Sequence, residues 1–181
     1  MTTSPSFVQV KRPDVPGLPE CAPQQVCNAM FLRLNHTQHL CNCPSSFPNP
    51  CPVSQDQEDG HTLNLVADKK GQVLTSVKIC DPILTIKTCD AQQDWMLLAL
   101  QSMRTGKAHY LVICQCPSSG ELIGPISHEN PPYADIPGIR VFGMICARGE
   151  RSARRSEKAY PEVPWDRIIN FMNTTVWRSE L

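Results

Sequence analysis

Ten cysteines among 181 residues constrain the fold of this chain more than any other feature. The number is even, so every cysteine can be paired, while 17 prolines and only 6% aromatic residues leave little material for a large apolar core. Disulfides persist where thiols are oxidised, and they stabilise small domains whose core is insufficient. We therefore expect a secreted, extracellular protein in which all ten form bridges: Cys21, Cys27, Cys41, Cys43, Cys51, Cys80, Cys89, Cys114, Cys116 and Cys146.

Other features agree with an extracellular location. The tripeptides that begin at Asn35 and Asn173 match the glycosylation pattern N-x-[ST], which predicts a glycoprotein. The segment from Met1 to Phe7 is polar and precedes no signal-type apolar run, so we expect a mature region or fragment whose leader has been removed. No stretch has the roughly 20 apolar residues of a membrane span. A net charge of +0 gives no field to attract nucleic acid or an anionic membrane.

Two similar cysteine patterns follow one another along the chain. Each has a lone cysteine, a hairpin, a C-x-C-P-S-S segment, a loop rich in Pro or Gly, and an apolar strand that runs into a last cysteine. Aligning Cys27 with Cys89 leaves Cys21 and Cys51 as extras of the first copy. The repetition predicts an internal duplication.

The repeat divides the chain into four parts. Residues 1–20 carry prolines without an apolar period and predict an extended or disordered arm. Residues 21–80 form the first predicted cysteine module, and residues 81–147 form the second. Residues 148–181 combine a basic linker with an amphipathic helical tail.

The apolar segments predict a mostly β fold made of small, disulfide-rich antiparallel hairpin modules. They are short, rich in Val, Ile and Leu, and separated by turn residues. His61–Ala67 and Gln72–Lys78 give the clearest hairpin, and Trp95–Ser102 is expected to be a strand although a helix is the alternative. The tail predicts one short helix behind Pro164, with an apolar stripe made of Trp165, Ile168, Ile169, Met172 and Val176.

Duplication reduces the many disulfide pairings that ten cysteines allow. If each hairpin is closed at its base, the pairs are Cys27–Cys43, Cys89–Cys116, Cys41–Cys80, Cys114–Cys146 and Cys21–Cys51. The swapped alternative joins Cys27 to Cys41 and Cys43 to Cys80. The sequence favours the first set only slightly.

Metal binding and catalysis find little support in the sequence. Structural zinc sites use C-x-x-C pairs, whereas the one-residue gap of C-x-C places both sulfurs on the same face of a strand. The five histidines are dispersed, and no nucleophile elbow, H-E-x-x-H or phosphate loop accompanies them. We expect no metal, no cofactor and no enzymatic activity.

The basic stretch after the last cysteine has two interpretations. Arg151, Arg154 and Arg155 form a candidate processing site for a proprotein convertase in a secreted protein. The alternative, which charge runs favour in general, is a solvated linker.

Ligand contacts are expected on the hairpins and loops. The candidate segments are residues 30–34, 95–104 and the loops of 117–133, with Trp95, Arg104 and Tyr133 as the contacts singled out. The alternative for Trp95 is a place in the core of its module.

The segments Leu40-Cys41-Asn42-Cys43-Pro44 and Ile113-Cys114-Gln115-Cys116-Pro117, with their flanking cysteines, resemble the giant-lens (Argos) family of secreted cysteine-rich proteins and the related large centipede scoloptoxins. The strand Asp59–Leu65, leading to Lys78-Ile79-Cys80-Asp81-Pro82, is also similar. The resemblance covers about Cys21 to Cys146. It implies β modules distantly like three-finger domains that clamp an EGF-like growth factor and keep it from its receptor. Giant-lens proteins carry more modules than the two seen here.

The leading hypothesis is a secreted module that binds an extracellular protein, either an EGF-like growth factor or a receptor, and acts as a signalling antagonist. The alternative, implied by the likeness to the centipede proteins, is a venom-type toxin or effector acting on a receptor or channel. Neither hypothesis involves nucleic acid or a membrane span.

Overall fold

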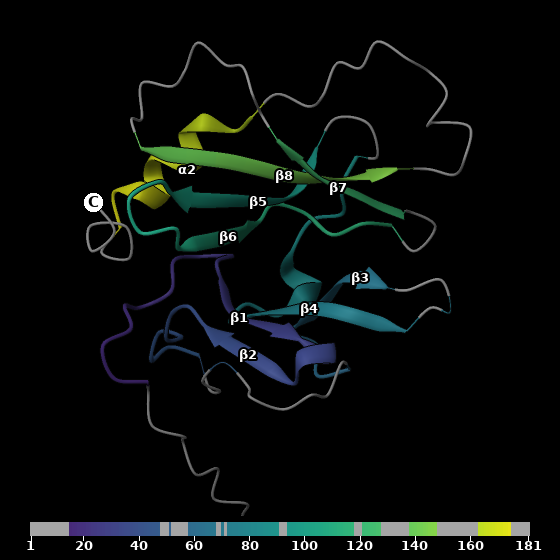
Figure 1. Ribbon diagram of the computed structural model, residues 1–181, viewed down its shortest axis with the longest axis horizontal. Helices are drawn as coiled ribbons and strands as arrows, with labels where there is room; N and C mark the ends of the chain where they lie inside the picture. Colours follow the sequence, from purple (N-terminus) through teal and green to yellow (C-terminus); the bar gives the residue numbers. More distant parts are fainter. Residues whose placement is uncertain are drawn as a thin grey trace, which may run out of the picture.

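In the part of the chain that it describes, the computed structural model is mostly β, with two antiparallel sheets and one short α-helix, as the sequence predicts (Figure 1). Its description covers residues 15–47, 51, 58–67, 70, 72–90, 94–117, 121–127, 138–147 and 163–174. The first sheet has the order β2-β1-β4-β3 and consists of β1 (Val26–Phe31), β2 (His36–His39), β3 (Thr62–Ala67) and β4 (Val73–Ile79). The second sheet has the order β6-β5-β8-β7 and consists of β5 (Trp95–Ser102), β6 (Ala108–Val112), β7 (Glu121–Ser127) and β8 (Ile139–Ala147).

The two sheets have the same plan, and each lies inside one of the predicted modules. In each, the first strand is central, its hairpin partner lies on one side, and the last strand of the module lies on the other. A β-bulge interrupts the pairing at the start of both central strands, between Val26 and Asn28 in β1 and between Trp95 and Leu97 in β5. The β3–β4 hairpin and the β5 strand confirm the predictions for those segments.

One predicted loop contains a strand. The segment 117–133 was expected to carry loops, but Glu121–Ser127 forms β7 and pairs with β8. Its sequence, Glu121-Leu122-Ile123-Gly124-Pro125-Ile126-Ser127, has Gly and Pro at its centre, which disguises it as a loop. A proline is tolerated here because β7 is the edge strand of its sheet.

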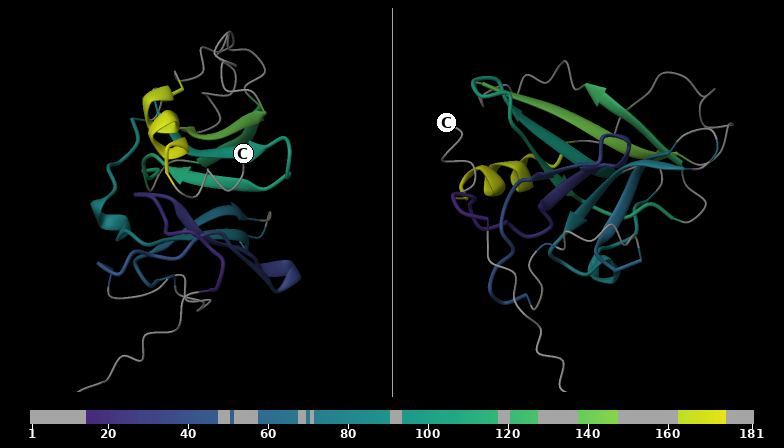
Figure 2. Two further views of the ribbon diagram at one scale, coloured as in Figure 1. Left: turned by 90° about the vertical axis from the view of Figure 1, so that its left-hand side faces the viewer. Right: turned by 60° about the horizontal axis from the view of Figure 1, so that its bottom comes forward.

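The sheets are stacked as two layers that share one apolar core (Figures 1 and 2). Val26, Ala29, Val77 and Ile79 of the first sheet belong to the same buried cluster as a set from the second sheet, Met96, Leu97, Val112 and Met144. These positions define the inner face of each layer. Side chains otherwise alternate between the faces of a strand, and the register shift between Trp95 and Leu97 lets the consecutive residues Met96 and Leu97 both face inward. Neither sheet buries its inner face alone.

The outer face of the second sheet is covered by α2 (Trp165–Met172). Leu98 and Leu100 alternate with the inner residue Leu97, and they pack in one cluster with Ile168 and Phe171 of the helix. The expected helix is therefore present, but its apolar stripe differs from the prediction. Ile169 is 47% exposed, because the buried face of the helix runs through Ile168 and Phe171; Val176 lies outside the described residues.

The last part of the predicted N-terminal arm is bonded to the first module. Glu20 and Asn42 form a parallel bridge, and the Asn42 side chain accepts a hydrogen bond from the Val15 amide at 3.0 Å. Its Nδ2 group donates to the Val15 carbonyl at 2.9 Å and the Leu18 carbonyl at 3.2 Å. Residues 15–20 are thus held on the cysteine framework, and residues 1–14 lie outside the description.

Candidate functional site

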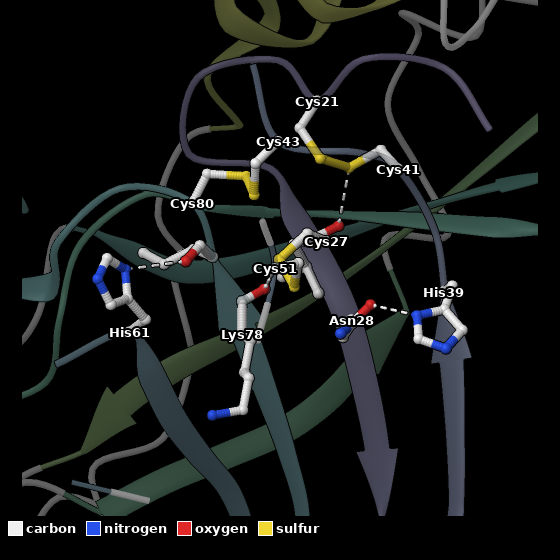
Figure 3. The surroundings of a disulfide bond; sticks show 12 residues. Cys21, Cys27, Asn28, His39, Cys41, Cys43, Cys51, His61, Lys78 and Cys80 are labelled. Atoms are coloured by element: carbon white, nitrogen blue, oxygen red, sulfur yellow. Dashed lines mark hydrogen bonds between the residues drawn. A yellow bond between two sulfur atoms is a disulfide. The ribbon is translucent and has the colours of Figure 1, made fainter. Parts of the chain in front are cut away.

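All ten cysteines are paired, in five disulfides that differ from the pairing favoured by the sequence. Figure 3 shows the cysteines of the first module. The pairs are Cys21–Cys41, Cys27–Cys51, Cys43–Cys80, Cys89–Cys114 and Cys116–Cys146. The swapped alternative named two pairs, and of these only Cys43–Cys80 is present in the structure. Every bridge lies within residues 21–80 or within residues 89–146, so none joins the two sheets.

The favoured pairing was wrong because the two copies had been aligned on the wrong cysteine. The counterpart of Cys89 is Cys21, since each pairs with the first cysteine of its C-x-C segment at a Cα–Cα distance of 5.0 Å. Cys27 instead lies inside β1, at the bulge, and reaches Cys51. Cys27–Cys51 is therefore the bridge of the first module that has no counterpart in the second.

The residue between the two cysteines of each C-x-C segment explains this geometry. Asn42 forms a parallel bridge with Glu20, and Gln115 forms one with Thr88, which brings the upstream cysteine beside the first cysteine of the pair. Backbone hydrogen bonds of 2.7 Å from Cys21 N to Asn42 O and 2.8 Å from Cys89 N to Gln115 O close both arrangements.

Both amide side chains also form hydrogen bonds to the segment that precedes the upstream cysteine. Gln115 Nε2 donates to the carbonyls of Ile83 and Ile86, at 3.4 and 2.8 Å, as Asn42 does to those of Val15 and Leu18. The shared amide chemistry of Asn42 and Gln115 was visible in the sequence. The signal for the upstream cysteine was its spacing, because Cys21 precedes Cys41 by 20 residues and Cys89 precedes Cys114 by 25, whereas Cys27 lies closer to Cys41.

Several cysteine sulfurs are close together beneath the first sheet. Those of Cys21, Cys43 and Cys80 lie within 4.8 Å of one another, as do those of Cys27, Cys43 and Cys51. Metal ligation by cysteine requires a thiolate, and each of these sulfurs is half of a disulfide. The clusters therefore pack as apolar material with Phe47.

A buried ion pair lies on the outer face of the first sheet. Lys78 has no exposed surface, and its Nζ donates to Asp59 Oδ2 and, at 2.7 Å, to the Thr62 hydroxyl. Burial alone would raise the pKa of the Asp59 carboxyl. The hydrogen bonds from Lys78, the His61 amide and Thr62, together with the Lys78 charge, outweigh this and lower the pKa below its ordinary value.

The predicted ligand contacts have different surroundings. Trp95 is only 2% exposed and packs with α2. It therefore belongs to the core, which was the alternative interpretation, and it offers no surface to a partner. Arg104 is exposed in the turn between β5 and β6. Tyr133 lies outside the described residues, as do Arg151, Arg154 and Arg155 of the candidate processing site.

The two hairpin turns present similar chemistry to solvent. At the β1–β2 turn, Leu34 is 75% exposed beside the exposed Arg33; at the β5–β6 turn, Met103 is 57% exposed beside Arg104. Methionine and arginine are enriched at protein interfaces, and an exposed leucine adds apolar surface that a partner can bury. We name these two pairs of residues the tip residues.

Both predicted glycosylation asparagines are exposed. Asn35 ends the short helix η1 (Leu32–Leu34) in the left-handed conformation, and Asn173 follows the end of α2. A sequon needs an exposed loop position, and both sites meet that requirement.

Sequence reasoning missed the junction between the two sheets and the helix, where Gln24 makes most of the polar contacts. This residue has a positive φ of 59° and donates its N–H to Asp81 Oδ2 at 2.9 Å. Its carbonyl accepts from the Val112 amide of β6 at 2.9 Å, and its side-chain oxygen accepts from Arg167 of α2. This residue of the first module thus contacts Asp81, which directly follows that module, as well as the second sheet and the helix.

The neighbouring Gln25 adds a buried contact at the same junction. It has no exposed surface, and its Nε2 lies 3.2 Å from Nδ1 of the equally buried His109 on β6. An antiparallel bridge between Gln25 and Leu111 continues the contact along the backbone. These polar links supplement the apolar core between the layers.

Comparison with known proteins gives one informative likeness. No protein-family model matches the sequence, and no curated protein matches it. Among solved structures, the chain is similar to the crystal structure of unliganded Argos, with 25% sequence identity and a TM-score of 0.55. The likeness covers 71% of this chain and 57% of the Argos chain. It supports an Argos-like fold and leaves the relation to the centipede proteins as a prediction.

Proposed function

We propose that this chain is a secreted protein that binds an EGF-like growth factor and so antagonises signalling through the receptor of that factor. The observation that carries the proposal is the likeness to Argos in sequence and fold together, over 71% of this chain. The cysteine motifs pointed to the same family, and the five bridges suit an oxidising, extracellular environment. The described part of the chain contains no helix that could span a membrane.

The likeness covers only part of the Argos chain, so the test must ask whether this part binds a growth factor by itself. The chain spans less than two thirds of the Argos chain that it matches. The two sheets of the described residues offer less surface for enclosing a ligand than a protein with more modules. A proposal of growth-factor binding therefore includes the claim that these two sheets retain a contact surface of their own.

The tip residues are the proposed contact surface. Leu34 and Met103 each expose an apolar side chain on a turn, where burial against a partner removes that surface from water and stabilises a complex. Arg33 and Arg104 form no ion pair with any described residue, so their charges remain available for carboxylates of a partner. An acidic partner surface with an apolar pocket fits either turn.

The binding experiment uses the disulfide-intact chain against a panel of immobilised EGF-like growth factors in biolayer interferometry. We expect saturable binding to at least one factor and inhibition of receptor phosphorylation in cells given that factor. Leu34→Ala and Met103→Ala should each weaken binding about tenfold if their turn is a contact, the cost of losing a hot-spot side chain. Ile169→Ala, an exposed apolar residue on α2, is the matched control.

Failure to bind any factor of the panel, with the fold shown intact by circular dichroism, would contradict the proposal. If both turn variants bind as tightly as the wild type, the tip residues are not the contact surface, but the proposal of growth-factor binding is not contradicted.

Secretion, glycosylation and processing form part of the same proposal. Mass spectrometry of the protein from conditioned medium should show N-glycans on Asn35 and Asn173. Cleavage after Arg151, Arg154 or Arg155 is expected under the processing hypothesis, and an intact chain to Leu181 would refute it.

A further inference from the structure

A small open pocket lies at the junction organised by Gln24, separate from the tip residues. Its volume is about 190 Å³, and all three parts of the fold line it. The segment Ala22–Gln24 forms one wall, β6 with Ile113 forms the floor, and α2 forms the other wall.

The pocket joins an apolar floor to a polar rim. Leu111, Ile113 and Phe171 line it with side chains that are 4%, 6% and 4% exposed, so its interior is hydrocarbon. Arg167 and Asn170, one helical turn apart on α2, are exposed and stand at its edge. Apolar pockets with a few converging polar groups are the usual form of a binding site.

The charge at the rim selects the ligand. Arg167 donates to Gln24 Oε1, which is a neutral acceptor, and no carboxylate among the described residues lies within ion-pair distance of its guanidinium. A guanidinium has five N–H donors arranged to hold a carboxylate through two parallel hydrogen bonds. The hydrogen bond to Gln24 leaves donors for this purpose and fixes the direction of the side chain.

The size of the pocket limits what can fill it. Sites for complete small-molecule ligands begin at about 300 Å³. A volume of about 190 Å³ is therefore enough for one apolar side chain but short for a long acyl chain or a cofactor.

We propose that this pocket binds the free C-terminus of a partner protein whose last residue is apolar. The last side chain lies on Ile113 and Phe171, and the terminal carboxylate pairs with Arg167. This proposal does not depend on growth-factor binding, because it uses neither turn.

The test titrates the 15N-labelled, disulfide-intact chain with N-acetyl-Gly-Gly-Leu carrying a free carboxylate and, separately, with its C-terminal amide. We expect saturable chemical-shift changes at Leu111, Ile113 and Phe171 with the acid. The amide should bind at least tenfold more weakly, as the loss of a charge-assisted hydrogen bond implies.

Variants separate binding from folding. Arg167→Gln should weaken binding of the acid about tenfold. Arg140→Gln, which removes an exposed arginine of β8 that does not line the pocket, should leave binding unchanged. Because Arg167→Gln also loses a bond to Gln24, Asn170→Trp provides a second arm, blocking the mouth from an exposed position without touching that bond.

Three outcomes would overturn the proposal: equal affinity for acid and amide, no shift changes at millimolar peptide, or tighter binding of octanoate than of the peptide. The last would assign the pocket to a fatty acid.

Discussion

At the scale of single residues, Lys78 places a charged ammonium group in a fully buried position of the first sheet. A buried ammonium is stable only when paired, and Asp59 is its one carboxylate partner among the described residues. We expect Asp59→Asn to lower the free energy of unfolding by about 3 kcal/mol at pH 7, because it leaves the charge of Lys78 uncompensated. Urea denaturation with the disulfides intact measures this, and Lys78→Met, which removes the charge itself, should cost less.

The same pair makes stability depend on pH. Because the pKa of Asp59 is lowered in the folded protein from an ordinary value of 3.8, its contribution is present above that value and is lost as the pH falls through the folded pKa. The stability difference between wild type and Asp59→Asn should therefore shrink on acidification below about pH 4. A difference that stays constant from pH 7 to pH 2 would contradict the assigned pairing.

Gly143 on β8 is required by its contact with Trp95. A Cβ atom at this position would lie 2.2 Å from Cε3 of the indole, a distance that forces the ring or the strand to move. Gly143→Ala should lower the free energy of unfolding by about 1–3 kcal/mol, the usual cost of overpacking. The near-ultraviolet circular dichroism of Trp95 should change with it, whereas Arg140→Ala, exposed on the same strand, should have no measurable effect.

At the scale of elements, the Cys27–Cys51 bridge distinguishes the first copy from the second. It closes a sequence separation of 24 residues, and the β5 strand has no cysteine at the equivalent bulge. Replacing both cysteines with serine should cost about 3 kcal/mol in the chain-entropy model, while Cys21–Cys41 and Cys43–Cys80 keep the sheet folded. Peptide mapping without reduction should recover the other four pairs unchanged; a reshuffled map would contradict independent bridges.

The α2 helix is held by one face. Phe171 is 4% exposed, so Phe171→Ala should cost about 3–5 kcal/mol through the cavity that it leaves. Ile169, which is 47% exposed on the same helix, is the matched control and should tolerate alanine with a much smaller loss. Equal losses at the two positions, measured by thermal unfolding, would mean that the helix does not pack as described.

The elements were predictable from sequence where a local pattern determines them. Alternation and turn residues located the β3–β4 hairpin, and helical spacing located α2. The pattern failed at β7, where Gly124 and Pro125 are acceptable only because the strand is at an edge, and edge position depends on the whole sheet. It also failed for Cys21, whose role depends on the bridge between Glu20 and Asn42, twenty-odd residues apart in the chain.

At the scale of the whole molecule, the shared core makes the two sheets interdependent. Val26 and Ile79 of one layer are fully buried together with Met96 and Val112 of the other. We expect residues 15–90 expressed alone to expose this face, bind a hydrophobic dye and give a poorly dispersed NMR spectrum, whereas residues 15–174 should give a dispersed one. A dispersed spectrum from the shorter chain would show that the first module folds independently.

The candidate site was less predictable than the fold because it is assembled from distant residues. Exposure of Arg104 in a turn follows from local sequence, but the burial of Trp95 follows from the position of α2, about 70 residues later. The junction pocket joins residues near positions 24, 112 and 167, which no local pattern relates.

Since every disulfide stays within its own sheet, the protein should yield to mechanical force in two distinct stages. Under an optical trap that pulls on the two ends, the layers should first separate at low force, because only non-covalent contacts hold one layer on the other. In the second stage each sheet should unfold, but the disulfides keep the closed loops from extending. The final extension should therefore stay well below the contour length of the reduced chain, and adding a reductant should increase it by the length of the opened loops.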